Sequence, residues 1–124
     1  MGRRSNFKDK QPRDYWPTVD PAAVTTLIPF IKGKTFAEPC VGNGDLVDLL
    51  FVDAKCNWES DIEPQKKGVI QKDATDLTAE DLVDCDYIIT NPPFSFEMLQ
   101  PLLDYLPTLK PTWLLLNATF MQNK

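Results

Sequence analysis

The sequence predicts an α/β fold in which a mostly parallel sheet of about five strands is flanked by helices. Short apolar segments typical of buried strands alternate along the chain with helical segments, an order that favours a parallel sheet covered on both faces. A polar residue follows each of the first four strands, at the edge where such sheets bind ligands. With 124 residues, 43% hydrophobic and 25% charged, the chain suffices for one core and is too short for a second.

The first half of the chain should supply a helix, a strand and a second helix. Residues 21–31 are expected to be helical, because Pro21 after Asp20 suits the first helical position and apolar residues continue to the end of this range. After a Lys-Gly-Lys turn, residues 35–38 form the first strand. Residues 45–51 form the second helix, with leucines on one side.

The second half should supply the remaining strands and two further helices. Ser95 is a favoured N-cap for the last helix, although Pro101 strains its middle. The other elements follow from short apolar runs between turn residues. The expected strands are 57–60, 68–71, 87–90 and 112–116, and the expected helices are 79–83 and 96–106.

Composition restricts the chemistry that the chain can perform. The sequence contains no histidine, which excludes an imidazole base and any Ser-His or Cys-His nucleophile. Cys40, Cys56 and Cys85 are odd in number and lack paired metal-ligand spacing, so neither a disulfide framework nor a metal site is expected. No apolar run approaches the ~20 residues of a membrane span, and no apolar signal segment follows the basic start. We therefore expect a cytoplasmic protein without a membrane partner.

Charge divides the chain into a basic arm and an acidic domain. Residues 1–13 hold five basic residues and one acid, whereas residues 14–124 hold eight basic and seventeen acidic residues. An acidic surface binds nucleic acid poorly, because duplex affinity comes largely from neutralising phosphates. The arm could contact phosphates, but a solvated, disordered terminus is the commoner state of such a segment.

Unusual polar residues follow the first four expected strands. Glu38-Pro39-Cys40 ends the first, Asp61 the second, Asp73 the third and Asn91 the fourth. Because the carboxyl ends of parallel strands meet at one edge of a sheet, these side chains should face a common crevice. Packing alone does not explain four polar strand ends in one place.

The loop after the first strand has the character of a ligand-binding turn. Gly42 and Gly44 allow a tight turn and a close approach to the backbone, although Gly-x-Gly alone is often just a loop. The longer glycine motif of dinucleotide folds and the lysine of phosphate loops are both missing. A cofactor with a carboxylate and an ammonium but no phosphate would need neither. Glu38 could pair with the ammonium, and the loop amides could hold the carboxylate.

Two acids suit a nucleoside. Asp61 lies about twenty residues beyond the glycines, where an acid accepts hydrogen bonds from ribose hydroxyls in nucleotide-binding sheets. Asp73 could accept a bond from the adenine amino group of a cofactor. Each acid alone is more often a surface carboxylate. Their order and their place at strand ends favour a cofactor site.

The segment Asn91-Pro92-Pro93-Phe94 predicts recognition of a planar amino group. Two prolines remove two backbone donors, so the segment offers acceptors: the Asn91 side-chain oxygen and the Asn91 and Pro92 carbonyls. Phe94 supplies a stacking face beside them. An exocyclic NH2 such as that of adenine could donate both N–H bonds here while its ring stacks. The structural alternative is a proline-rich turn that ends a strand.

Four motifs occur in an order that resembles a known family. They are Glu-Pro-Cys-x-Gly-x-Gly (38–44), Asp-Ile-Glu-Pro (61–64), Asp-Ala-Thr-Asp (73–76) and Asn-Pro-Pro-Phe (91–94). This order is similar to that of class I S-adenosylmethionine-dependent N-methyltransferases, in particular phage-type DNA adenine-N6 methyltransferases. The resemblance covers residues 35–117 and implies a Rossmann-like fold, S-adenosyl-L-methionine as cofactor and DNA as partner.

The resemblance also implies roles for individual residues. Asn91, Pro92, Pro93 and Phe94 are the implied catalytic residues, and Asn91 also borders the cofactor. Ile62 and Ala74 would flank the cofactor's adenine, and Phe96 would close over it. Residues 14–18 look like the segment that covers the methionine end in phage-type enzymes. The implied cofactor-binding residues are Tyr15, Pro17, Thr18, Glu38, Pro39, Cys40, Gly42, Gly44, Asp61, Ile62, Asp73, Ala74, Asn91 and Phe96.

The chain departs from the family at its C-terminus. The full fold continues through a terminal antiparallel hairpin, which this sequence does not contain. The chain is therefore a fragment, a minimal enzyme or a non-catalytic relative that binds cofactor or another protein. The open edge left by the fifth strand is a pairing liability that a second copy could cover.

The acceptor also has alternatives. The same tetrapeptide could hold a protein glutamine amide or a guanine amino group in RNA. Enzymes that act on protein glutamine usually have Tyr at the position of Phe94, which favours a base.

Overall fold

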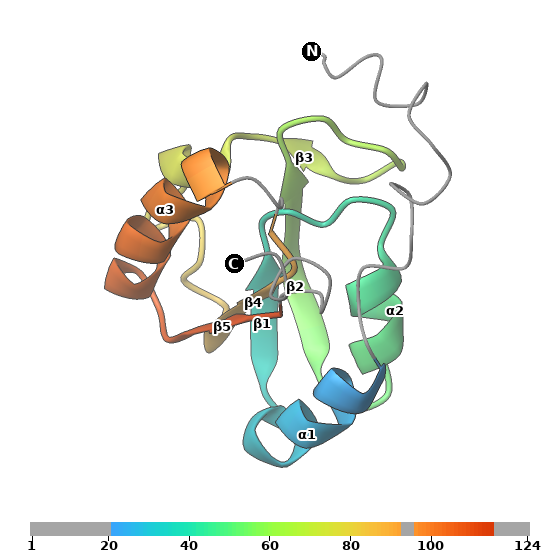
Figure 1. Cartoon of the computed structure of the whole chain (residues 1–124). Coiled ribbons are helices and arrows are strands. Elements are labelled where there is room, and N and C mark those ends of the chain that lie inside the picture. The colour runs from blue at the N-terminus through green and yellow to red at the C-terminus, as the bar shows by residue number, and fades with distance from the viewer. Residues whose placement is uncertain (1–20, 93–95, 116–124) are drawn as a thin grey trace.

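The computed structural model describes residues 21–92 and 96–115, which form a five-stranded sheet covered on both faces. Every strand pairing is parallel, and the strand order is β3-β2-β1-β4-β5. The predicted α/β class and mostly parallel sheet are confirmed. Figure 1 shows α1 and α2 on one side of the sheet and α3 on the other. The strands are β1 (Thr35–Glu38), β2 (Lys55–Asp61), β3 (Ile70–Gln71), β4 (Tyr87–Thr90) and β5 (Thr112–Leu114).

Alternation along the central strands distributes their side chains between two cores. Phe36 of β1 and Ile89 of β4 pack with α1 (Pro21–Ile31) and α2 (Asp45–Leu50). Their neighbours Ala37 and Ile88 point to the opposite face and pack with α3 (Phe96–Tyr105) and with the segment between β3 and β4. This period-2 pattern is the signature of strands buried on both faces.

The segment between β3 and β4 differs from the helix that the sequence predicts at residues 79–83. It forms a short 3-10 helix, η3 (Ala74–Asp76), and then consecutive turns with i to i+3 backbone bonds through residue 85. The prediction of a helix at 79–83 was wrong, because a single turn fixes several residues for few hydrogen bonds and gains no stability from its own length. A second 3-10 helix, η4 (Leu106–Thr108), follows α3.

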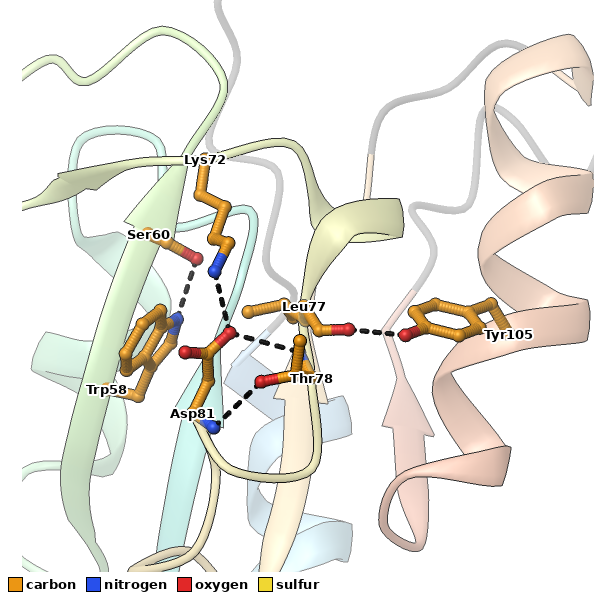
Figure 2. Close-up of polar contacts among 7 residues, drawn as sticks. All are labelled: Trp58, Ser60, Lys72, Leu77, Thr78, Asp81 and Tyr105. Carbon is orange, nitrogen blue, oxygen red and sulfur yellow. Dashed lines mark hydrogen bonds and ion pairs between the residues drawn. The ribbon is translucent and has the colours of Figure 1, made fainter.

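Side-chain hydrogen bonds hold this segment in place, as Figure 2 shows. The Asp81 carboxylate accepts the Thr78 backbone N–H at 3.0 Å and the Lys72 ammonium at 2.8 Å, and the Asp81 N–H in turn bonds the Thr78 hydroxyl at 3.1 Å. The Tyr105 hydroxyl of α3 donates to the Leu77 carbonyl. These hydrogen bonds stabilise the turns of the segment between β3 and β4, which contains Asp73, and connect this segment to α3.

Several predicted residues lie outside the described part of the chain. They are the arm 1–13, Tyr15, Pro17, Thr18, Pro93, Phe94 and Ser95, and Phe96 is described only as the first residue of α3. None of the helices in residues 21–92 and 96–115 has the length and apolar character needed to cross a membrane.

Candidate functional site at the carboxyl edge of the sheet

The candidate site lies where the direction of strand order reverses. The chain builds β1, β2 and β3 outward on one side of the sheet and then places β4 on the other side of β1. Ligands of open α/β sheets bind at such a switch point, beyond the carboxyl ends of the strands. Glu38 ends β1 and Thr90 ends β4, so both residues border this position.

Buried polarity is concentrated at this edge. Among the described residues, the buried polar side chains are Glu38, Ser60 and Thr90. They lie at the carboxyl ends of β1, β2 and β4, the three central strands. Burying a polar group is unfavourable without a partner, and these side chains have partners: the Thr90 hydroxyl donates to Glu38, and Ser60 accepts the Trp58 indole N–H at 2.8 Å.

Glu38 is the centre of this cluster. One carboxylate oxygen, Oε1, accepts the Cys40 N–H at 2.8 Å and the Thr90 hydroxyl; the other, Oε2, accepts the Asn91 N–H at 3.2 Å. Burial, with Glu38 only 1% exposed, raises its pKa to about 7 despite these hydrogen bonds, and the charge of Asp61 adds to the rise. Both carboxylate oxygens thus already accept hydrogen bonds from the protein itself. An ion pair between Glu38 and a cofactor ammonium stays a prediction.

Asn91 presents an acceptor that nothing in the described chain satisfies. Its Oδ1 is the one buried side-chain polar atom without a hydrogen-bond partner in residues 21–92 and 96–115. Leaving a buried acceptor unpaired costs about 1–3 kcal/mol, so natural proteins rarely keep one without a reason. Pro92 beside it is buried. A ligand N–H donor would remove the cost at Asn91.

The glycine loop meets the end of β2. Gly42 and Gly44 both have positive φ, 56° and 94°, in the left-handed region that favours glycine. The Gly42 N–H donates to Asp61 Oδ2 at 2.8 Å, and no atom lies within 4 Å of the position that a Cβ of Gly42 would take. At Gly44 the corresponding position lies 2.8 Å from the ammonium of Lys66. The loop is therefore open at Gly42 and covered by a flexible cation at Gly44.

The Cys40 thiol is affected by the charges of the predicted acids. Burial raises the pKa of the half-buried Cys40 thiol, and the charges of Glu38, Asp61 and Asp73 raise it further. The thiol consequently stays protonated and is a poor nucleophile. The charges of Glu38 and Asp61, which end β1 and β2, and of Asp73, which follows β3, therefore all act on Cys40.

The predicted adenine contacts are unequal. Ile62 exposes 54% of its surface after β2 and is free to contact a ligand, whereas Ala74, the first residue of η3, is buried in the core on the α3 face of the sheet. Asp73 caps η3 through its Oδ1, which accepts both the N–H and the hydroxyl of Thr75. Pro39 is also fully buried.

Two residues at this edge escaped the sequence analysis. Thr90 bonds Glu38 across 52 positions of sequence, and nothing local marks a strand threonine as a partner. Lys66 lies over Gly44 and pairs with Glu59 of β2, its ammonium 3.5 Å from Oε1. Asp61, Glu63 and Lys67 lie close to Lys66 in the sequence, so nothing in the spacing distinguishes Lys66 from its charged neighbours.

Two surface depressions lie away from this site. A depression of about 600 Å³ lies between the end of α2 and the start of β2, and one of about 440 Å³ lies between α1 and β5. Neither is lined by a residue that the sequence predicts to bind cofactor. Within the described ranges, no group of three or more Cys, Asp or Glu side chains could hold a metal ion.

Comparison with protein-family models, with curated proteins and with solved structures finds no match.

Proposed function

We propose that this chain binds S-adenosyl-L-methionine and serves methyl transfer to an exocyclic amino group, with adenine N6 in DNA as the acceptor. The observation that carries this proposal is the buried, unpartnered Oδ1 of Asn91 at the switch point of the sheet. The same proposal gives the four ordered motifs a common purpose.

The residues around the proposed cofactor position fit such a ligand. Each oxygen of Asp61 accepts one backbone N–H, from Gly42 and from Glu63, which leaves lone pairs for ribose hydroxyls. The space at Gly42 is open, as a closely approaching ligand requires. When bound, the cofactor would supply a methyl group on a sulfonium.

The chain's own residues would supply orientation and charge stabilisation. Adenine N6 is a weak nucleophile because its lone pair is delocalised into the ring. The Asn91 Oδ1 and the Pro92 carbonyl would accept its two N–H bonds and draw the nitrogen toward tetrahedral geometry. Positioned acceptors of this kind need neither histidine nor a thiolate.

A base in duplex DNA must first leave the stack, at a cost of a few kcal/mol. Stacking on Phe94, which lies outside the described residues, would return about 1–3 kcal/mol of it. The acidic domain binds phosphates poorly, so DNA affinity would come from the basic arm or from a partner chain.

The test is transfer of labelled methyl groups by the full chain to separate pools of DNA, RNA and protein. We expect label in DNA adenine, lost in Asn91→Ala and retained in Asn57→Ala, a matched change on exposed β2 surface. Label confined to RNA or to protein would replace DNA as the acceptor. Label in no pool, together with binding of the cofactor, would instead indicate a non-catalytic binding protein.

A further inference from the structure

Glu38 connects the two loops that the proposed function requires. Its Oε1 accepts the N–H of Cys40, which begins the loop that contains Gly42 and Gly44. Its Oε2 accepts the N–H of Asn91, the residue directly after β4. We propose that Glu38 is a positioning residue whose carboxylate holds the backbone of Asn91, so that the placement of Asn91 depends on the protonation state of Glu38. This inference rests on the proposed function for its consequence in catalysis, but the link itself can be tested without it.

The geometry favours positioning over simple packing. The Asn91 N–H belongs to the same residue as the unpartnered Oδ1, so fixing that N–H fixes the backbone from which the side chain projects. Thr90, immediately before it, is held through its hydroxyl by the other carboxylate oxygen. Two successive residues of the acceptor segment are therefore bound by one buried side chain that lies more than fifty positions earlier in the sequence.

Protonation would change this arrangement. An ionised carboxylate is an acceptor only, whereas the protonated form carries an O–H that must itself donate. The two backbone N–H donors cannot reverse, whereas the Thr90 hydroxyl can turn to accept the added proton. Protonation also removes the negative charge that strengthens the two backbone hydrogen bonds, so both become weaker. The Asn91 bond, at 3.2 Å, is longer than the 2.8 Å Cys40 bond and is the easier to lose.

Two thiols and one acid act electrostatically on Glu38, and the two thiols do not titrate in the same pH range as Glu38. They are Cys40 from its own loop and Cys56 and Asp61 from β2. Burial raises the pKa of Cys40 and raises that of Cys56 to about 12, so both thiols stay protonated near neutral pH. Asp61 contributes a negative charge that opposes ionisation of Glu38.

The link is tested by following backbone amide resonances of the full chain against pH, without any ligand. We expect the Cys40 and Asn91 amide protons to shift together with a common midpoint near neutral pH. Glu38→Gln should remove both shifts, and Glu80→Gln, which changes an exposed glutamate on the turn before β4, should keep them. Independent midpoints, or shifts that persist in Glu38→Gln, would overturn the link.

A second variant keeps the test decisive if Glu38→Gln does not fold. Thr90→Val is nearly isosteric and removes the hydroxyl that stabilises the Glu38 carboxylate, while both backbone donors remain. The common midpoint should then move to higher pH. An unmoved midpoint would show that the described hydrogen bond does not act on Glu38 and would overturn the proposal.

The consequence for catalysis is tested by methyl transfer to a single-stranded adenine oligonucleotide. The wild-type rate should rise with pH through the midpoint seen in the amides, and Glu38→Gln should lose about tenfold in rate, the effect of losing a hydrogen bond to a charged group. An unchanged rate in Glu38→Gln would overturn the positioning role. If the wild type transfers no methyl group to any acceptor, the proposed function fails, and the amide titration still decides whether Glu38 controls Asn91.

Discussion

Gly42 donates its backbone N–H to Asp61 Oδ2 at 2.8 Å, which joins the glycine loop after β1 to the end of β2. The other oxygen, Oδ1, accepts the Glu63 N–H at the same distance. Two backbone donors thus orient a carboxylate that remains partly exposed and can accept further bonds. Asp61 shapes the loop, and under the proposed function it would also accept hydrogen bonds from the cofactor.

Replacing Asp61 with alanine should weaken cofactor binding. The variant loses the proposed ribose acceptor and the bond that orders Gly42, so affinity for S-adenosylhomocysteine should fall about tenfold or more by calorimetry. Asp48→Ala, an exposed change on α2, should leave the affinity unchanged.

A pair of simpler ligands separates these two effects. If Asp61 accepts ribose hydroxyls, wild-type protein should bind adenosine more tightly than 2′,3′-dideoxyadenosine, and this difference should shrink in Asp61→Ala. An equal difference in both proteins would assign Asp61 to loop structure alone.

Alanine at Asn91 and alanine at Asn57 should have different effects on the free energy of unfolding. The Asn91 Oδ1 is buried without a partner, so Asn91→Ala removes an unsatisfied group and should leave the free energy of unfolding unchanged or slightly higher. Asn57 donates to the Asp84 carbonyl at 2.7 Å, so Asn57→Ala should lose about 1 kcal/mol. Urea unfolding measures both. A clear loss of stability in Asn91→Ala would mean that its side chain is kept for structure rather than for a ligand.

The sequence predicts which residues lie at this edge of the sheet, but it does not predict the hydrogen bonds between them. Each polar residue at the end of a strand could be placed, because parallel strands bring their carboxyl ends to one side whatever their order. Glu38 and Asp61 were singled out in this way, and the structure places both at that edge. The partnership of Glu38 with Thr90 could not be predicted, because it joins residues 52 positions apart that meet only after β4 pairs with β1.

The turns at residues 79–84 illustrate the same limit. Their apolar spacing fits a helix, but tertiary contacts override it. Asp81 turns back to the Thr78 N–H and pairs with Lys72, and Leu82 is drawn into the core. A segment of this length gains more from such contacts than from one helical turn.

Stability should decrease as the pH rises toward neutrality. Burial raises the pKa of Glu38 from 4.5 to about 7, so the folded state holds a proton that the unfolded state releases. The stabilisation is fully present below pH 4.5 and is lost as the pH rises through about 7. At about 1.4 kcal/mol per pKa unit, this one group accounts for up to ~3 kcal/mol.

Glu38→Gln isolates that contribution. Its free energy of unfolding, measured in urea between pH 5 and 7.5, should vary less with pH than that of the wild type. The lowered pKa values of Asp81 and Asp86 act in the opposite direction and at lower pH, where stability is lost as these acids become protonated. They do not obscure the window above pH 5. Parallel pH profiles for both proteins would contradict a buried, titrating Glu38.

Deleting residues 1–13 should weaken DNA binding and flatten its dependence on salt. The domain that remains carries eight basic against seventeen acidic residues, so the five basic residues of the arm are the chain's concentrated source of phosphate contacts. Each phosphate contact adds about 0.9 to the slope of log K against log salt for duplex DNA.

Replacing the five basic residues of the arm with glutamine should reproduce the effect of the deletion. Glutamine at five basic residues of the folded domain should have a smaller effect; these are Lys32, Lys34, Lys55, Lys67 and Lys110. Binding measured by anisotropy at several salt concentrations gives the slopes. An unchanged slope after the deletion would place the phosphate contacts on the folded domain or on a partner, and the arm would then have no part in binding DNA.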